Sequence, residues 1–393
     1  MERGSCSFVG GNRESAIFST MKNFLSLIMT SVTLLVLAGC GGDNHPEVSG
    51  QTASSSPLEN RFRAVISQNF RTNQLTGVAA GLWVPGQPPA ILTLGNSDIP
   101  NGVKVRPEDH FRIGSVTKSF TVTALLQLAE EGKLSLDDPI EKYLPGLQNG
   151  SATLAQLADM TSGIFNYTND QQILVKLLSD LTAEFTEQEL LDAANRNTPY
   201  FAPGGGWHYS NTNTVALGLV IEQVTGNSLA EELGARIFQP LGLNNTSYPS
   251  GLDLPVPFAH GYGLFEEGGE LQDVTASSPS ASAGSGAMVS ALDDLRVWGK
   301  ALGSGSLVSP QLQARRLQLI STDGCPECPE YDGYGLGIGT LNGWRGHTGD
   351  YLGYQALVMY DPETEAVMVI LTNFKNFTSS GHFPTDMFRD IVE

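Results

Sequence analysis

Apolar residues follow two patterns along this chain, and each pattern predicts a different kind of secondary structure. From Ser115 to about Glu131 the apolar positions return every three or four residues, and Gly132 follows, so a helix is expected there. Gly77–Val84 and Ala90–Leu94 are instead short apolar runs separated by a proline-rich turn, which is the pattern of two adjacent strands. The N-terminal part therefore predicts strands followed by a helix.

The middle of the chain is predicted to be helical, and its end to be rich in strands. Between Leu134 and about Tyr248 there are few strand signals, and helical spacing is clear in Glu187–Asn195, Asn213–Thr225 and Leu229–Ile237. One more helix is expected near Leu292–Leu302. The C-terminal part predicts three strands and a closing helix, at Gly335–Leu341, Leu352–Tyr360, Ala366–Thr372 and Phe383–Val392.

Strands near both ends of the chain, with helices inserted between them, define the expected fold class. It is mixed α/β, of the α+β kind, with one antiparallel sheet built from the N- and C-terminal segments and flanked by helices. A mostly helical subdomain is expected as an insertion at about residues 134–280. The folded domain is expected to span residues 59–393, which is long enough to bury a large core.

Residues 21–40 have the pattern of an export signal. Lys22 precedes the apolar run Phe24–Ala38, which is short for a membrane span but suits the core of a signal peptide. The run ends in Leu-Ala-Gly-Cys40, and this segment resembles the bacterial lipobox, which implies that Cys40 carries lipid. We therefore expect a lipoprotein signal peptide at 21–40. An uncleaved anchor without lipid is the alternative.

Two flanking segments complete this interpretation. Residues 1–20 lie upstream of a plausible start at Met21 and are expected to be a mis-called extension, while residues 41–58, rich in Gly, Ser, Asp and Pro, are expected to be a flexible tether. An acyl chain on Cys40 would hold the protein at a membrane without a spanning helix. The expected location is the cell envelope, on the periplasmic or extracellular face.

Charge and cysteine content narrow the function classes. The net charge is −19, and a nucleic-acid binder needs a positive field, so no nucleic-acid partner is expected. Besides Cys6 and Cys40, the chain holds one close pair, Cys325-Pro-Glu-Cys328, which outside the cytoplasm could close a small disulfide loop. A zinc site built from two such pairs is excluded because there is no second pair, and no metal is expected.

Ser115 and Lys118 are the first candidates for chemistry. Their spacing of three places both side chains on one face of the expected helix. A serine hydroxyl is a weak nucleophile until a base takes its proton, and a lysine whose pKa is lowered by burial can be that base. Gly114 permits a tight entry into the helix. The alternative is a helix-capping serine followed by a surface lysine.

Two further motifs contain groups that could assist. Tyr209-Ser-Asn211 follows a glycine-rich loop, and its tyrosine could relay a proton while its asparagine bonds a substrate carbonyl or the lysine. His347-Thr-Gly349 lies beside an expected strand, where an imidazole and a hydroxyl could bind a carboxylate or adjust nearby pKa values. Taken alone, each also fits a plain structural role, as a turn into a helix and as a strand with a solvent-facing histidine.

The three motifs together, S-x-x-K, Y-S-N and H-T-G, resemble the signature set of serine penicillin-binding enzymes. The chain closely resembles D-alanyl-D-alanine carboxypeptidases of the class C β-lactamase-like family, which implies a β-lactamase/transpeptidase-like fold. The similarity runs from about Glu59 onward and includes Phe111–Phe120, Glu131–Leu136, Tyr143–Gly146, Met160–Gly163 and Ile237–Leu243.

The resemblance implies a role for each matching residue. Ser115 would be the acylated nucleophile, Lys118 its proton acceptor, and Tyr209 the group that moves protons to the leaving group. The substrate would be bound by Asn211, His347, Thr348 and Gly349, and the backbone N–H groups of Ser115 and Asp350 would hold the oxyanion. Such an enzyme uses no metal and no cofactor. Its substrate would be a small peptide, a β-lactam or an ester.

Two departures from the family pattern concern the substrate. Carboxypeptidases of this type are expected to bind the terminal carboxylate with an arginine on the strand before H-T-G, but Tyr334–Thr340 contains none, and Arg345 is not clearly equivalent. Asp350 follows Gly349, and its carboxylate would repel a substrate carboxylate unless its side chain turns outward. An esterase, a β-lactamase and a non-catalytic penicillin-binding or envelope-interaction protein therefore stay open, although intact Ser115, Lys118, Tyr209 and Asn211 argue against the last.

Overall fold

The computed structural model describes residues 56–325 and 328–393. The expected leader, Cys40 and nearly all of the expected tether lie outside the described residues. The first described helix, α2 (Pro57–Thr72), begins inside the range expected to be a tether, because Ser56 caps it through the backbone N–H of Glu59 and Pro57 occupies its first turn. Among the described residues, no helix has the length and apolar character needed to cross a membrane.

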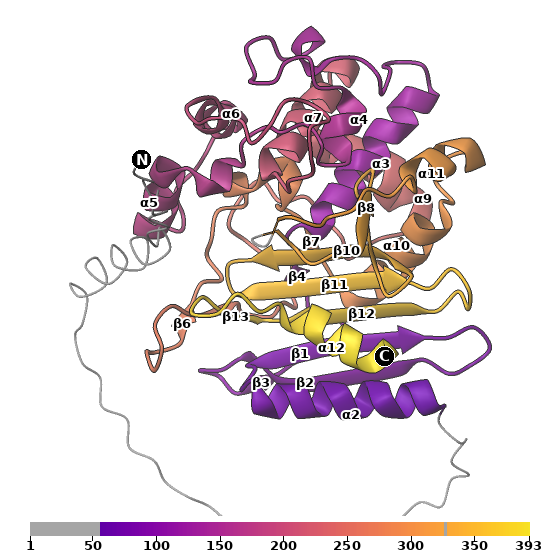
Figure 1. Ribbon diagram of the computed structural model, residues 1–393. Helices are drawn as coiled ribbons and strands as arrows, with labels where there is room; N and C mark the ends of the chain where they lie inside the picture. The colour runs from indigo at the N-terminus through magenta and orange to yellow at the C-terminus, as the bar shows by residue number, and fades with distance from the viewer. Residues whose placement is uncertain (1–55, 326–327) are drawn as a thin grey trace, which may run out of the picture. The chain divides into compact units, whose positions relative to one another are not determined.

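The largest sheet joins the two ends of the described chain (Figure 1). It has eight strands in the order β3-β2-β1-β12-β11-β10-β9-β8, and the pairing of β1 with β12 is antiparallel, with Val78 opposite Thr372. The fold class expected from sequence is therefore confirmed. The strands are β1 (Gly77–Trp83), β2 (Ala90–Asp98), β3 (Val103–Lys104), β8 (Gly333–Gly335), β9 (Ile338–Leu341), β10 (Trp344–Tyr351), β11 (Tyr354–Tyr360) and β12 (Val367–Thr372).

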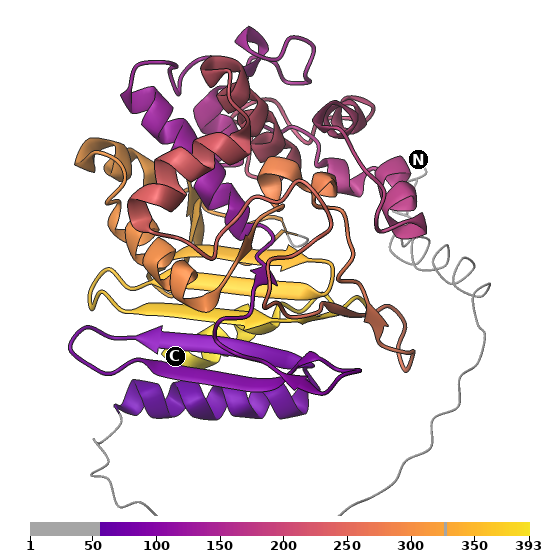
Figure 2. The same cartoon turned by 180° about the vertical axis from the view of Figure 1, so that it is seen from behind.

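Helices cover both faces of this sheet, which explains why its central strands are continuous apolar runs. α2 and α12 (Phe383–Val392) pack on one face, and α10 (Leu292–Ser304) packs on the other, as the two opposite views show (Figures 1 and 2). Along β12, Met368 and Ile370 belong to the core under α2 and α12, whereas Val369 belongs to the opposite core. Alternate side chains of one strand thus enter two different cores.

The remaining helices lie between the N-terminal and C-terminal strands in the chain. α3 (Val116–Glu130) and α7 (Asn211–Thr225) are buried on nearly all sides and pack against each other, and α3 also contacts β10. Within residues 134–280, helices continue to Leu241 and two short strands follow. The other helices are α4 (Leu154–Ala158), α5 (Gln171–Ser179), α6 (Glu187–Asn195), α8 (Leu229–Leu233), α9 (Gln239–Leu241) and α11 (Pro310–Arg316).

Two small sheets complete the described structure. β13 (Phe374–Asn376) pairs with β5 (Tyr262–Leu264), which pairs with β6 (Gln272–Asp273). β4 (Phe111–Arg112) pairs with β7 (Val289–Ser290) just before Ser115. These strands of two or three residues are too short to produce an alternating pattern, and the sequence did not predict them.

Two predicted elements are wrong in detail. The single strand expected at Gly335–Leu341 is a hairpin, because β8 ends at Gly335 and β9 begins at Ile338. The turn depends on Gly337, which has φ of +64° and lies where a Cβ atom would be 2.6 Å from Val122. The helix expected at Leu229–Ile237 ends as an α-helix at Leu233 and continues as one wider turn over Gly234–Phe238.

Candidate active site

Ser115 lies where a short buried strand turns into a helix. β4 ends at Arg112 and α3 begins at Val116, so Ser115 occupies the N-cap position, where it is half-buried. Gly114 has φ of +49°, which favours glycine, and a Cβ atom there would lie 2.6 and 2.7 Å from the backbone O and N of Asp350. The start of α3 is therefore in direct backbone contact with β10.

Lys118 is buried and reaches three oxygen atoms. Its Nζ lies 2.9 Å from Ser115 Oγ, 2.6 Å from Asn211 Oδ1 and 2.7 Å from the carbonyl oxygen of Ser285. Burial lowers the pKa of Lys118 well below its usual value, and no carboxylate contributes to the shift. The alternative of a surface lysine is wrong, because its side chain is 0% exposed. A neutral amine in this position can accept a proton from Ser115.

Asn211 is held so that its carbonyl oxygen faces Lys118. Its backbone N–H donates to Asn166 Oδ1 at 3.1 Å, and its Nδ2 donates to Thr168 Oγ1 at 3.3 Å. The first turn of α7 thus brings Asn211 to the site as the sequence predicted. The sequence did not predict Asn166, Thr168 or the carbonyl of Ser285, because a backbone carbonyl or a polar loop residue has no pattern of its own.

Tyr209 packs beside this pair with its hydroxyl inside the protein. Lys118 Nζ lies 4.9 Å from the centre of the Tyr209 ring. Burial raises the pKa of Tyr209 well above its usual value, while the Ser115 side chain lowers it to a lesser degree. Within the described residues the hydroxyl has no partner at hydrogen-bond geometry. Tyr209 therefore stays protonated at neutral pH and can donate a proton or a hydrogen bond.

His347 is held between two tyrosines that belong to no motif of the sequence. Its Nε2 lies 2.8 Å from Tyr334 Oη, and its Nδ1 lies 3.2 Å from Tyr331 Oη. Burial, with a smaller contribution from Lys118, lowers the pKa of His347 to about 3, so the ring is neutral at pH 7. The alternative of a solvent-facing histidine is wrong, because His347 is 0% exposed. Tyr334 lies on the strand where carboxypeptidases of this type are expected to have an arginine.

Along part of its length, β10 pairs with another strand on one side only and leaves its other edge open. β10 pairs with β11 from Arg345 to Tyr351, but it pairs with β9 only from Trp344 to Gly346. At this edge the N–H of Thr348 donates to Tyr331 Oη at 2.9 Å, and Thr348 Oγ1 lies 2.7 Å from the same oxygen. Since N–H groups alternate along a strand, the N–H of Asp350 points the same way.

The backbone of β10 and the start of α3 come together at this edge. A Cβ atom at Gly349 would lie 2.0 Å from the carbonyl oxygen of Ile113 and 3.3 Å from the backbone N of Ser115. Only a glycine permits this approach. The N–H groups of Ser115 and Asp350 are consequently neighbours, as an oxyanion-binding pair requires.

The side chain of Asp350 is paired rather than free. Its carboxylate forms an ion pair with Lys375 of β13 and lies 3.4 Å from Gln355 Nε2. The Lys375 side chain is 15% exposed, so most of it is covered. Arg345 lies at the other end of β10, opposite Tyr360, and does not replace the absent arginine. Lys375 could not be predicted from the sequence, because a salt bridge across 25 residues has no local pattern.

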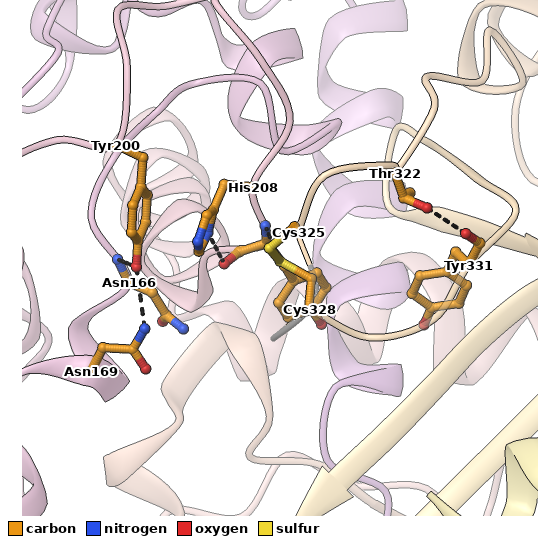
Figure 3. The surroundings of a disulfide bond; sticks show 9 residues. Asn166, Asn169, Tyr200, His208, Thr322, Cys325, Cys328 and Tyr331 are labelled. Atoms are coloured by element: carbon orange, nitrogen blue, oxygen red, sulfur yellow. Dashed lines mark hydrogen bonds between the residues drawn. A yellow bond between two sulfur atoms is a disulfide. The ribbon is translucent and has the colours of Figure 1, made fainter. Parts of the chain in front are cut away.

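One group of side chains among the described residues has donor atoms spaced for a metal ion. Ligand atoms of His208, Cys325 and Cys328 lie within 4.8 Å of one another. The two sulfur atoms are joined in a disulfide (Figure 3), so neither is available as a thiolate ligand. The loop closure that the cysteine spacing allowed is present in the structure.

An antiparallel sheet packed against a helix that begins with a serine, with a buried lysine one turn later, defines a serine hydrolase of the β-lactamase/transpeptidase fold. The family model described as Beta-lactamase matches residues 62–384, and the chain belongs to this family.

Three known proteins illustrate the relationship. Protein flp of Staphylococcus aureus (strain MRSA252) is 29% identical over 299 residues, covering 72% of this chain and 56% of flp, so the chain spans little more than half of that relative. A D-stereospecific amidohydrolase from Streptomyces sp. has a TM-score of 0.72 and 29% identity, covering 86% of this chain and 96% of its own. A D-amino acid amidase from Ochrobactrum anthropi SV3, complexed with L-phenylalanine amide, has a TM-score of 0.75 and 26% identity, covering 86% and 97%.

Proposed function

We propose that this protein is a peptidase or amidase that acts on cell-wall-type peptides or D-amino-acid amides through an acyl-enzyme on Ser115. It would resemble D-alanyl-D-alanine carboxypeptidases in chemistry. The observation that carries the proposal is the contact of 2.9 Å between Ser115 Oγ and the fully buried Nζ of Lys118. A purely binding protein gains nothing from burying an amine beside a serine at the cost of its solvation.

In the proposed reaction Lys118, as a neutral amine, takes the proton of Ser115 while Ser115 Oγ attacks the substrate carbonyl carbon. The negative oxygen that forms is held by the N–H groups of Ser115 and Asp350. Tyr209 passes a proton to the leaving nitrogen as the amide bond breaks, and the acyl group stays on Ser115. Lys118 returns its proton to Tyr209, and water then attacks the ester carbonyl carbon while giving a proton to the Tyr209–Lys118 pair. The pair passes this proton to Ser115 Oγ as the ester C–O bond breaks and the acid is released.

The charges around the site favour substrates without a free terminal carboxylate. His347 is neutral, and Lys375 is already paired with Asp350. Neither offers an unpaired cation for a carboxylate, and the two structural relatives above are a D-stereospecific amidohydrolase and a D-amino acid amidase. We therefore place the amidase reaction ahead of strict carboxypeptidase trimming. An esterase or β-lactamase on the same scaffold is the second candidate, because it needs the same Ser115–Lys118 pair.

A substrate panel tests this proposal. The purified protein is incubated with a D-amino-acid amide, a D-Ala-D-Ala peptide, a p-nitrophenyl ester, a chromogenic cephalosporin and a fluorescent penicillin, and the adduct is located by mass spectrometry. Turnover of the amide or peptide with an adduct on Ser115 is expected. Turnover of the ester or the cephalosporin alone would support the second candidate, and an adduct on another residue would disprove the mechanism.

Attachment to the cell envelope is a separate part of the proposal. We infer from the lipobox-like segment that Cys40 is lipidated and that the domain is exported and held at a membrane surface. In cells, Cys40→Ser should move the protein from the membrane fraction to the soluble fraction. Ser49→Ala, in the expected tether, is the matched control, and an equal membrane fraction in both variants would contradict the anchor.

Gly114→Ala should lower kcat/KM by about a hundredfold, because the added Cβ would push Asp350 away from Ser115 and spoil the oxyanion-binding pair. Gly132→Ala is the matched control: Gly132 also has positive φ, of +71°, but a Cβ atom there meets nothing within 4 Å. Both variants are compared by steady-state kinetics and thermal unfolding. Equal activity of the two would show that Asp350 does not hold the oxyanion.

Asp350→Ser should shift the substrate preference toward free carboxylates. The change keeps the backbone N–H and leaves Lys375 without its partner, so Lys375 can attract a substrate carboxylate. The ratio of kcat/KM for a D-Ala-D-Ala peptide to that for its C-terminal amide should rise about tenfold. In the double variant with Lys375→Met the ratio should return toward the original value. An unchanged ratio in Asp350→Ser would rule out this role of the pair.

A further inference from the structure

The Cys325–Cys328 disulfide lies against the backbone of Tyr209. The N–H of Tyr209 donates to Cys328 Sγ at 3.3 Å, and His208 Nδ1 lies 3.0 Å from the carbonyl oxygen of Tyr209. Figure 3 shows both cysteines beside His208, the residue before Tyr209 in the chain. The sulfur is therefore a direct contact of a residue that the proposed reaction uses.

Tyr209 depends on such contacts because it lies outside any helix or strand. The segment just before α7 has no regular structure, so its N–H groups need partners from elsewhere in the chain. The N–H of His208 donates to the carbonyl of Met160 at 3.1 Å, and the N–H of Asn211 donates to Asn166 at 3.1 Å. Between His208 and Asn211, the N–H of Tyr209 has Cys328 as its partner, and Tyr209 is the residue that moves protons in the proposed reaction.

The segment that contains this disulfide also contacts β10, on the other side of the site. Tyr331 follows Cys328 by three residues, and its hydroxyl contacts His347 and Thr348 on β10. Thr322 Oγ1 donates to the carbonyl oxygen of Tyr331 (Figure 3). The cross-linked segment thus contacts Tyr209 through Cys328 and the open edge of β10 through Tyr331.

We propose that the Cys325–Cys328 disulfide is a positioning element for Tyr209, and that breaking it slows the reaction through Tyr209 while leaving the Ser115–Lys118 contact intact. This inference rests on the proposed function. A phosphine reductant such as TCEP supplies two electrons and is oxidised, water supplies two protons and the oxygen it gains, and the S–S bond becomes two thiols. The freed Cys328 side chain can then rotate away from the Tyr209 N–H. Misplacement of a catalytic group by about 1 Å can cost up to about a hundredfold in rate.

The test is a double-mutant cycle on the full chain. Cys325→Ser/Cys328→Ser is made in the original sequence and together with Tyr209→Phe, and TCEP treatment of the original protein is measured in parallel. EDTA is present throughout, so that thiols and His208 cannot capture a metal ion. We expect kcat to fall about tenfold in the original sequence and less than twofold with Tyr209→Phe, with KM nearly constant. TCEP should reproduce the loss in the original protein and have no effect on the variant without Cys325 and Cys328.

A second readout does not depend on activity. With 3-fluorotyrosine incorporated, the ¹⁹F resonance that disappears in Tyr209→Phe should shift or broaden on reduction, whereas that of Tyr360, buried at the far end of β11 opposite Arg345, should not. If no substrate is turned over but the Tyr209 resonance moves, the proposed function fails and the positioning role stands. Equal losses in both backgrounds, no loss in either, or an unmoved Tyr209 resonance would each overturn the inference.

Discussion

Ser115→Ala should lower kcat/KM by at least about 10⁴-fold for every substrate that the protein hydrolyses, because no acyl-enzyme can form without the hydroxyl. The fold should persist. Lys118 keeps its bonds to Asn211 and to the carbonyl of Ser285, so the buried amine is still satisfied. Steady-state kinetics measure the loss, and intact-protein mass spectrometry should show that the adduct formed with a slow substrate is absent.

The matched control is Ser304→Ala, at the exposed end of α10, which should change neither activity nor the adduct. Ser115→Ala with more than about a tenth of the original activity would show that another nucleophile acts. A variant that loses activity together with its thermal unfolding transition would be misfolded, and Ser115→Cys, which keeps a nucleophilic side chain of similar size, would then decide by restoring an adduct at this position.

Lys118→Met should lower kcat/KM by about 10³-fold, because the variant keeps the volume of the side chain but has no base beside Ser115. In the original protein, kcat/KM should fall as the pH drops through the lowered pKa of Lys118, since only the neutral amine can take the proton. Lys300→Met, on the surface of α10 where the lysine pairs with Glu365, is the matched control and should leave activity unchanged. Activity within tenfold of the original would exclude Lys118 as the base.

Stability should depend on pH in a way that Lys118 controls. Burial lowers its folded-state pKa, whereas the unfolded chain keeps a value near 10.5, so between these values the unfolded chain binds more protons. The free energy of unfolding contributed by this residue therefore rises with pH over that interval, by about 1.4 kcal/mol per pH unit where the difference is a full proton. Denaturant unfolding from pH 7 to 9.5 should show this rise in Lys300→Met and not in Lys118→Met. Equal slopes would mean that Lys118 is charged in the folded state.

The fold was predictable where burial leaves a mark on the chain. β1, β11 and β12 are covered on both faces, so they are nearly unbroken apolar runs, and α12 was predicted with its observed bounds. β10 was only partly predicted, because the polar site residues His347, Thr348 and Asp350 interrupt its apolar pattern. The single strand predicted at Gly335–Leu341 is the β8–β9 hairpin in the structure, because Gly337 permits a tight turn.

The candidate site was predictable only as far as its motifs reach. Ser115, Lys118, Tyr209 and Asn211 come together as expected, since their roles demand particular side chains at particular spacings. Tyr331, Tyr334 and Lys375 were missed, although each contacts a predicted residue. Such contacts arise between distant segments and leave no repeat or spacing in the chain. The motifs also could not show that His347 is neutral, since its environment comes from the packing.

The pairing of β1 with β12 has a consequence for how the molecule is made. Next to this pair, Thr76 Oγ1 donates to Asn373 Oδ1 at 2.8 Å across 297 residues of chain. Closing so long a loop is slow, and neither core can form around β1 before β12 has left the ribosome. The sheet therefore cannot close until β12 has been made, and until then β1 has an unpaired apolar edge that a chaperone could bind. The order of the strands thus delays closure of the sheet until its C-terminal strands are available.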